Sequence, residues 1–295
     1  MLIENTFFGI QDKEQIAIER LKAFEPADGY FVAYSGGKDS DVVLDLCKRG
    51  GVKFEAHFAV TSVEAPETIY YIRRDHPEVI WDFPRYRNGK VKTMWQLIVD
   101  KRMPPTRLAR YCCQELKECS GVGRVTVTGV RWAESVARKQ NRHMVDIGKK
   151  GDEQIVFNND NDEAKRMVEQ CYRTRKTLLN PIIDWTDAEV WEYIHKYQLK
   201  YNPLYDRGNK RVGCVGCPMS SRAGEELEQY PKIKALYLRA FDRMLKAFRV
   251  PPTLWRDADD VYDWWLKGEA YPSQIQTSLF NDQEEGKKRR NETND

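Results

Sequence analysis

The sequence predicts an α/β protein, with a mostly parallel sheet covered by helices on both faces and a mainly helical region at the C-terminal end. Runs of β-forming residues alternate with runs of helical apolar spacing through most of the chain, which is typical of a parallel sheet. Beyond Ala223 the apolar residues recur only at helical spacing. With 295 residues, the chain is long enough to bury one substantial core.

The individual elements follow from composition and spacing. Gly, Asn and Asp dominate residues 148–162, so we expect an exposed excursion there. Thr186 and Glu189 form a capping box ahead of a helix. The expected elements are a helix over 14–24, a strand over 30–34, a strand over 52–60, a helix over 66–75, strands over 79–83 and 125–130, and a helix over 190–198. We expect a nucleotide-binding domain over 1–220, a helical extension over 221–270 and a disordered tail over 271–295.

Composition narrows the class of protein. The 48 basic and 45 acidic residues give a net charge of +3, which by itself does not indicate a nucleic-acid partner. The first residues lack a basic stretch followed by an apolar run, and no apolar run approaches the roughly 18 residues of a membrane span. We therefore expect a cytoplasmic protein without a membrane partner. The seven cysteines predict metal ligands, reactive thiols or core residues and not a disulfide framework.

The segment SGGKDS, residues 35–40, joins the strand over 30–34 to a helical apolar run. Gly36 and Gly37 allow a tight bend that exposes N–H groups, and the helix N-terminus adds positive potential for an anion. Lys38 would supply a point charge, and Ser35 and Ser40 would supply hydroxyl donors. The spacing is too short for a GxxxxGK[ST] P-loop. The segment predicts a phosphate site, with a plain solvated turn as the alternative.

Further candidates follow other strands, because the carboxyl ends of parallel strands share one edge of a sheet. Thr61 and Ser62 come after the second strand and are small donors. Arg131 and Arg138 come after the strand over 125–130 and could clamp phosphate or sulfate bidentately. The alternative for these arginines is a surface cluster of ion pairs with Glu134.

The cysteines form a second constellation, with an adjacent pair and a CxxC. Together they could supply the four thiolates of a [4Fe-4S] cluster or a zinc site, and adjacent cysteines are an awkward chelate for zinc, which favours the cluster. A redox dithiol at the CxxC and a buried, unliganded Cys113 are the alternatives. Cys119 is a substitute ligand, while Cys47 and Cys171 are expected to be structural. The four candidate ligands are Cys112, Cys113, Cys214 and Cys217.

Four features in one order, SGGKDS, GVRWAESVAR, NPIIDWTDAEVWEYIHKYQLKYNPLYDRG and the CC plus CxxC arrangement, resemble the phosphoadenosine phosphosulfate (PAPS) reductase family of the ATP-pyrophosphatase (PP-loop) superfamily. The resemblance runs from about residue 30 to 219. It implies an adenine nucleotide α-hydrolase fold and a [4Fe-4S] cluster on the four cysteines. It also implies that ATP, adenosine phosphosulfate (APS) or PAPS binds to Ser35, Gly36, Gly37, Lys38, Ser40, Arg131 and Arg138.

One departure from the family pattern bears on the reaction. Sulfonucleotide reductases attack the sulfur of their substrate with a cysteine of a C-terminal segment, whereas residues 218–295 contain no cysteine. No Ser or Thr imitates a thiolate nucleophile near neutral pH. The sequence therefore favours the family's sulfur-transfer enzymes, which bind ATP, adenylate a nucleic-acid base or backbone oxygen, and use the cluster to present sulfur. A sulfur donor protein is then a candidate partner. The alternatives are a reductase that releases sulfite and a nucleotide or redox sensor without turnover.

In the favoured reaction an acceptor oxygen attacks the α-phosphorus. Lys38, Ser35 and Arg131 are the predicted catalytic residues, with Lys38 and the loop amides stabilising the pyrophosphate that leaves. Mg²⁺ would bridge the phosphates. Asp39 is a candidate ligand for Mg²⁺, although an acidic residue in a first helical turn also favours the helix dipole.

Two further segments point weakly to macromolecular partners. QTSLF, from Gln276 to Phe280, resembles the QxSLF peptide by which bacterial replication and repair proteins bind the sliding clamp. The alternative is an apolar pair that packs on the domain. The basic run of Arg173, Arg175 and Lys176 could face a polynucleotide, but a solvated face is the expectation.

Overall fold

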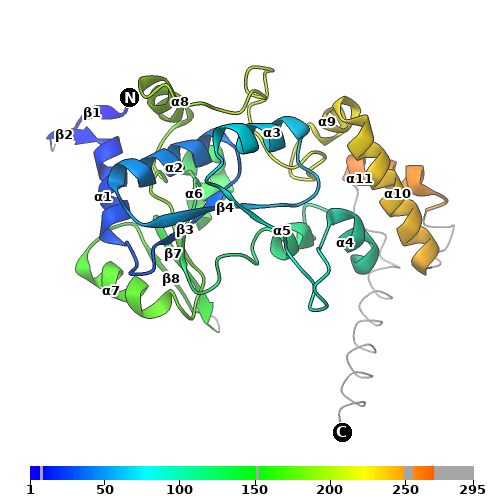
Figure 1. Cartoon of the computed structure of the whole chain (residues 1–295), viewed down its shortest axis with the longest axis horizontal. Helices are drawn as coiled ribbons and strands as arrows, with labels where there is room; N and C mark the ends of the chain where they lie inside the picture. Colours follow the sequence, from blue (N-terminus) through cyan, green and yellow to red (C-terminus); the bar gives the residue numbers. More distant parts are fainter. Residues whose placement is uncertain (7–8, 151–152, 249–254, 269–295) are drawn as a thin grey trace, which may run out of the picture. The chain divides into compact units, whose positions relative to one another are not determined.

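The computed structural model describes the chain except for residues 7–8, 151–152, 249–254 and 269–295 (Figure 1). The chain divides into two compact units, which we describe separately. The first comprises Met1–Met94 and Tyr111–Val215, and the second comprises Trp95–Arg110 and Gly216–Asp295. The predicted tail over 271–295, with the clamp-like peptide at 276–280, lies outside the described residues and stays a prediction.

The first unit is built on a seven-stranded sheet of order β5-β4-β3-β6-β9-β7-β8. Five strands run parallel to one another, and β7 and β8 are antiparallel additions at one edge. This arrangement confirms the predicted fold class. The strands are β3 (Tyr30–Tyr34), β4 (Phe54–Ala59), β5 (Ile80–Asp82), β6 (Val125–Val127), β7 (Val145–Lys150), β8 (Glu153–Phe157) and β9 (Thr177–Leu179).

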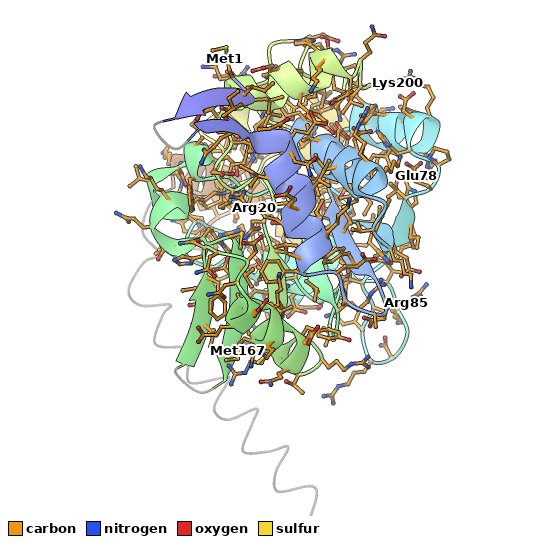
Figure 2. All side chains as sticks on the ribbon, turned by 90° about the vertical axis from the view of Figure 1, so that its left-hand side faces the viewer. Met1, Arg20, Glu78, Arg85, Met167 and Lys200 are labelled. Carbon is orange, nitrogen blue, oxygen red and sulfur yellow. The ribbon has the colours of Figure 1, made fainter. Side chains whose placement is uncertain are left out.

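Helices cover this sheet, and α1, α2 and α8 pack against one another. Arg20 on α1, labelled in Figure 2, donates two hydrogen bonds of 2.8 and 2.9 Å to Asp184. The predicted capping box is present, since Thr186 Oγ1 accepts from the Glu189 amide. The helices are α1 (Lys13–Ala23), α2 (Lys38–Gly50), α3 (Pro66–Asp75), α5 (Tyr111–Leu116), α6 (Val136–Asn141), α7 (Asp162–Cys171) and α8 (Asp187–Lys196), with a 3₁₀ turn η1 (Trp132–Glu134).

The excursion expected over residues 148–162 is wrong, because this segment contains the second half of β7, all of β8 and the start of α7. Val145 and Ile147 are buried and pair with β9. Gly148 was interpreted as a loop residue, but it serves a close approach between strands: its N–H donates to Lys176 O at 2.8 Å, and an added Cβ would lie 3.1 Å from the same oxygen. The hairpin β1 (Ile3–Thr6) and β2 (Gly9–Asp12) was not predicted.

The second unit is helical, as expected for the C-terminal region, and its core is aromatic. The rings of Trp95 and Tyr237 lie 5.1 Å apart, and those of Tyr237 and Trp265 lie 4.8 Å apart. Trp265 Nε1 donates to Pro105 O at 2.7 Å. Its helices are α4 (Met94–Lys101, from its second residue), α9 (Ala223–Gln229), α10 (Pro231–Phe248) and α11 (Ala258–Lys267). In the described part of the chain, no helix has the length and apolarity needed to cross a bilayer.

Candidate nucleotide-binding site

The loop between β3 and α2 depends on glycine for two reasons. Gly36 has a φ of +72°, in the left-handed region that L side chains rarely adopt. A Cβ at Gly36 would also lie 3.0 Å from side-chain atoms of Thr68 and Ile72 on α3. Gly37, the N-cap of α2, is extended, and a Cβ there would lie 3.3 Å from Tyr205 Oη. The loop is therefore packed tightly against α3 and the segment that carries Tyr205.

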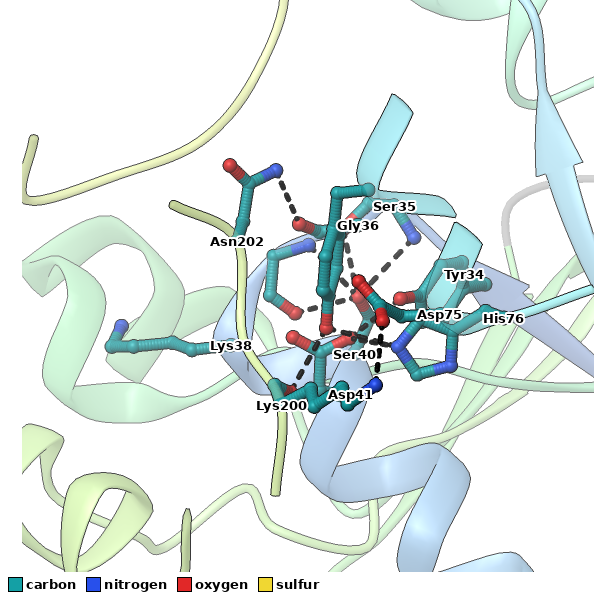
Figure 3. Close-up of polar contacts among 12 residues, drawn as sticks. Tyr34, Ser35, Gly36, Lys38, Ser40, Asp41, Asp75, His76, Lys200 and Asn202 are labelled. Atoms are coloured by element: carbon teal, nitrogen blue, oxygen red, sulfur yellow. Dashed lines mark hydrogen bonds and ion pairs between the residues drawn. The ribbon is translucent and has the colours of Figure 1, made fainter. Parts of the chain in front are cut away.

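Side-chain hydroxyl groups accept hydrogen bonds from the amides of this loop (Figure 3). Ser40 Oγ accepts from the amides of Gly37 and Ser35 at 3.1 and 3.3 Å and donates to Gly37 O at 2.7 Å. Ser35 Oγ donates to Ser40 Oγ at 3.2 Å. The Lys38 amide donates to Tyr205 Oη at 3.0 Å. Several donors thus converge at the N-terminus of a 13-residue helix, an arrangement that favours an anion.

Two buried cations and two carboxylates form a network beside the loop. Lys38 Nζ lies 2.9 Å from Asp187 Oδ1 and 3.3 Å from Asp39 Oδ2. Arg131 Nε donates to Asp39 Oδ1 at 2.7 Å, and its Nη2 lies 3.1 Å from Asp187 Oδ1. Lys38 and Arg131 are only 5% and 2% exposed. Burial alone would raise the pKa of Asp187, but hydrogen bonding and charge from Lys38, with the charge of Arg131, lower it. The two basic residues, 93 positions apart by subtraction of their numbers, therefore meet at one point.

Arg138 lies on α6 and forms an ion pair with Glu134. Glu134 also accepts from the Arg131 amide at 3.0 Å, so one carboxylate ties both predicted arginines to the same turn. Burial lowers the pKa of Arg138, and the positive charges of Arg211 and Arg142 lower it further. The structure therefore adds two arginines to this region that the sequence did not single out.

The other two predicted donors are engaged within the protein. The Thr61 amide and hydroxyl both donate to Glu64 Oε1, and Thr61 Oγ1 lies 3.5 Å from Cys214 Sγ. Ser62 Oγ accepts from the Met94 amide at 3.0 Å. Thr61 therefore lies beside the first cysteine of the CxxC and links the carboxyl end of β4 to the cysteine region.

The structure brings two of the predicted cluster ligands to one side chain, that of Lys117. The charge and hydrogen bonding of Cys214 raise the pKa of Lys117, and Cys113 adds to the effect. Cys112 and Cys113 lie on α5 of the first unit, whereas Cys217 belongs to the second. Among the described residues, no group of three or more His, Cys, Asp or Glu side chains is arranged to hold a metal ion. Lys117 therefore links Cys113 and Cys214, and no pattern in the sequence singled out this lysine.

The remaining cysteines have ordinary surroundings. Cys47 is buried in the core, and burial raises the pKa of its thiol to about 12. Cys171 is half-buried and lies 3.8 Å from Met167 Sδ. Cys119 is exposed and donates to Glu115 O at 3.4 Å.

A buried polar cluster on the far side of the loop was not predicted at all (Figure 3). Tyr34 Oη donates to Asp41 Oδ1 at 2.6 Å, and His76 Nε2 lies 2.9 Å from Tyr71 Oη and 3.6 Å from the same Asp41 oxygen. Asp41 is 3% exposed, and burial raises the pKa of its carboxyl to about 7. A cavity of about 80 Å³ lies beside Asp41 and His76. The available sequence signal was an acidic residue on an otherwise apolar helix face.

Asn202 connects this cluster with the loop. Its Nδ2 donates to Gly36 O and to Thr68 Oγ1, each at 3.1 Å, and the side chain is fully buried. Tyr71 Oη donates to Lys200 O at 2.9 Å. The segment around residues 200–202 therefore holds both the loop carbonyl and α3 in place.

A glycine turn at the end of a buried parallel strand, opening a helix beside buried cations, defines a nucleotide-binding α/β protein of the PP-loop type. The family follows from comparison of the sequence with known families. Residues 29–220, more than half of the chain, match the phosphoadenosine phosphosulfate reductase domain, and the chain belongs to this family. It is accordingly an enzyme with a nucleotide-binding domain.

Individual relatives are distant. The chain is 27% identical to an adenosine 5'-phosphosulfate reductase of Geobacillus kaustophilus over 65% of this chain and 74% of that protein. It is 24% identical to a phosphoadenosine 5'-phosphosulfate reductase of Gloeobacter violaceus over 68% and 75%. A 25% identical match to an uncharacterised protein of Methanocaldococcus jannaschii covers 74% of this chain but only 47% of that protein.

Some solved structures align with part of the chain. PAPS reductase from Candida auris, in a phosphate complex, aligns with a TM-score of 0.42 and 17% identity over 67% of this chain and 87% of that one. The NH3-dependent NAD synthetase of Campylobacter jejuni aligns with a TM-score of 0.37 and 16% identity over 79% and 90%.

Proposed function

We propose that this enzyme binds ATP at residues 35–40, transfers its adenylyl group to an oxygen of a nucleic acid, and promotes replacement of that oxygen by sulfur. The nucleotide part of this proposal rests on buried Lys38 and Arg131, which both pair with Asp39 beside the glycine turn. The absence of cysteine from residues 218–295 favours transfer over reduction.

The first step breaks one bond of the nucleotide and forms another. The acceptor oxygen attacks the α-phosphorus, the bond to the bridging oxygen of the β-phosphate breaks, and pyrophosphate leaves. The loop amides and Lys38 hold that leaving group, and Arg131 exchanges its contacts with Asp39 and Asp187 for a phosphate oxygen. In the second step a hydrosulfide from a donor protein displaces AMP, which leaves sulfur bonded to the acceptor.

Two cofactors belong to the proposal. Asp39 would hold Mg²⁺ on the phosphates, since a carboxylate oxygen suits this ion, once the nucleotide has drawn Lys38 and Arg131 away from it. Cys112, Cys113, Cys214 and Cys217 would hold a [4Fe-4S] cluster. Such a cluster supplies an iron site at which sulfur can be presented. The effect of both Cys113 and Cys214 on Lys117 supports these two members of the set.

A second candidate function is reduction of APS or PAPS to sulfite, because relatives in Geobacillus and Gloeobacter carry these names. The two candidates are separated by offering the anaerobically purified protein ATP, APS and PAPS in turn, with Mg²⁺ and a dithiol. AMP and pyrophosphate from ATP support transfer, with or without added nucleic acid. Sulfite from either sulfonucleotide contradicts it and supports reduction. Binding without any product supports a sensor.

The nucleotide site is tested by Lys38→Gln, with Lys48→Gln as the matched control at the other end of α2. Lys48 pairs with Glu78 away from the loop. We expect Lys38→Gln to reduce ATP turnover by a factor of about 100 or more, because a charge that stabilises a leaving group is lost. Lys48→Gln should turn over ATP at the parent's rate, and equal rates in all three proteins would refute the site.

The cluster ligands are tested by iron and sulfide content. Single Cys→Ala changes at the four candidate positions should each lower the content, whereas Cys119→Ala and Cys171→Ala should leave it unchanged. If all four single variants keep a full cluster, the ligand set is wrong.

A further inference from the structure

Four basic side chains near the glycine turn have no acidic partner. They are Lys139, Arg142, Lys210 and Arg211, which we call the cationic strip. All four are exposed. Within the described residues, none of them forms an ion pair, whereas the neighbouring Arg138 is paired with Glu134. The chain as a whole is close to neutral, with a net charge of +3, so this excess of positive charge is local.

The strip comes from two distant parts of the sequence that border the same loop. Lys139 lies in the last turn of α6, and Arg142 is the residue that caps this helix. Trp132 Nε1 donates to Arg142 O at 2.8 Å, which ties this end of α6 back to the turn that follows Arg131. In the other segment, Val212 follows Arg211 directly, and its Cβ lies 4.0 Å from the position that a Cβ on Gly37 would take.

The two arginines of the strip, Arg142 and Arg211, act on the same neighbouring side chain. Arg138 has its pKa lowered first by burial and then by the charges of Arg211 and Arg142, which belong to the two different segments. Burial also lowers the pKa of Lys176, and Arg142 lowers it further against the opposing effect of Glu118. Arg142 therefore acts on both Arg138 and Lys176. Like charges held together repel one another, and an anionic partner relieves this repulsion.

We propose that the cationic strip binds the phosphate backbone of a nucleic acid beside the bound nucleotide. This inference rests on the proposed function, because it supplies the surface on which the acceptor would lie. A single small nucleotide is matched by the buried cations Lys38 and Arg131. Exposed cations spread over two segments suit a repeating chain of phosphates instead, since such contacts are sequence-independent and solvent-accessible.

The test is fluorescence anisotropy of a labelled single-stranded oligonucleotide and of its duplex, titrated with the full chain over a series of salt concentrations. Four phosphate contacts predict a slope of log K against log salt of about −2.8 for the single strand and about −3.6 for the duplex. We expect Lys139→Gln with Arg142→Gln, and separately Lys210→Gln with Arg211→Gln, to flatten this slope by about 1.5 and to weaken binding roughly tenfold.

The matched control is Lys22→Gln with Lys53→Gln. It also removes two exposed charges, which precede β3 and β4 and so lie toward the opposite edge of the sheet. The control should bind as the parent does. The proposal is overturned if the parent binds no oligonucleotide at low salt or if both strip variants match the control. Polyglutamate competing as well as unlabelled polynucleotide would also overturn it, in favour of an acidic protein partner.

Failure of this inference is distinguishable from failure of the proposed function. The strip residues lie outside the set assigned to the nucleotide, so ATP turnover is measured on the same variants. Strip-dependent binding of nucleic acid without AMP formation would refute the reaction and leave the surface intact. Formation of AMP with unaltered nucleic-acid modification in the strip variants would refute the surface and leave the reaction intact.

Discussion

Asp39 and Asp41 stand two positions apart on the first turn of α2, yet they lie in opposite electrostatic surroundings. Asp39 accepts from Arg131 at 2.7 Å and lies 3.3 Å from Lys38 Nζ, so its charge is compensated. Asp41 meets the Tyr34 hydroxyl at 2.6 Å and His76, and its Oδ2 is buried without a hydrogen-bond partner. In Figure 3 the Lys38 side chain points away from the side on which Asp41 and His76 lie.

The difference teaches how one helix turn can serve two purposes. On the Asp39 side, the contacts are between charges that a nucleotide phosphate can exchange for its own. On the Asp41 side, burial raises the pKa of the carboxyl to about 7 and outweighs the hydrogen bonds from tyrosine hydroxyls, which lower it. The neighbouring imidazole of His76 is half-buried, and burial lowers its pKa. The first side offers binding groups, and the second fixes the loop against β3 and α3.

The largest effect should come from Arg131→Met. This change leaves Asp39 and Asp187 with Lys38 alone and removes a donor to Trp185 O. We expect the free energy of unfolding to fall by about 3 to 5 kcal/mol, because a partner of buried charge is lost. Chemical denaturation would measure this. Arg138→Met, which breaks a more exposed pair with Glu134, should cost about 1 kcal/mol or less. Equal losses of unfolding free energy in both variants would contradict the expected difference between the buried and the more exposed ion pair.

On the Asp41 side, the effect of a substitution on stability should depend on pH. An unfolded Asp ionises near pH 4, but folded Asp41 retains its proton to about pH 7, so the folded state binds more protons between these values. The parent therefore loses stability as the pH rises through this window. Asp41→Asn has no proton to lose, so its stability relative to the parent should rise by roughly 3 to 4 kcal/mol across the window and then stay level.

Urea unfolding at a series of pH values measures this effect. Asp45→Asn is the matched control, because it removes a carboxylate from the same helix and the same cavity. Stability curves of the parent and Asp41→Asn that run parallel from pH 4 to 7 would show that Asp41 does not hold its proton. The same relative gain in both variants would assign the effect to the cavity and not to Asp41.

The parts of the site that the sequence predicts are those marked by a pattern within one short segment. The glycine turn and its helix are correctly placed because β-formers, glycines and helical spacing all lie within one short segment. Asp187, Asn202 and Tyr205 lie in the family-like segment over residues 180–208, but they were missed as site residues because they reach the loop only through long-range packing, which the local pattern does not reveal. The hairpin of β7 and β8 was missed because Gly148 reads as a loop signal unless its neighbouring strand is known.

The smallest expected effect is the difference between alanine substitutions at two glycines. It separates the cost of backbone strain from the cost of packing on the Asp41 side. Gly36 and Gly51 flank α2 with φ values of +72° and +67°, so alanine is strained at both positions. Nothing lies within 4 Å of a Cβ at Gly51, whereas a Cβ at Gly36 would meet Thr68 and Ile72 at 3.0 Å. Gly51→Ala should cost about 1 kcal/mol of unfolding free energy, and Gly36→Ala about 1 to 2 kcal/mol more, since α3 must shift.

The two glycine variants also differ in what they should do to the ligand site. Displacing α3 from the loop disturbs the Asn202 bond to Gly36 O, so Gly36→Ala should weaken nucleotide binding about tenfold or more, while Gly51→Ala should bind as the parent does. Isothermal titration with ATP measures both affinities. If Gly36→Ala loses stability but keeps full affinity, the Asp41 side supports only the fold. The binding groups on the Asp39 side would then hold the nucleotide without help from α3.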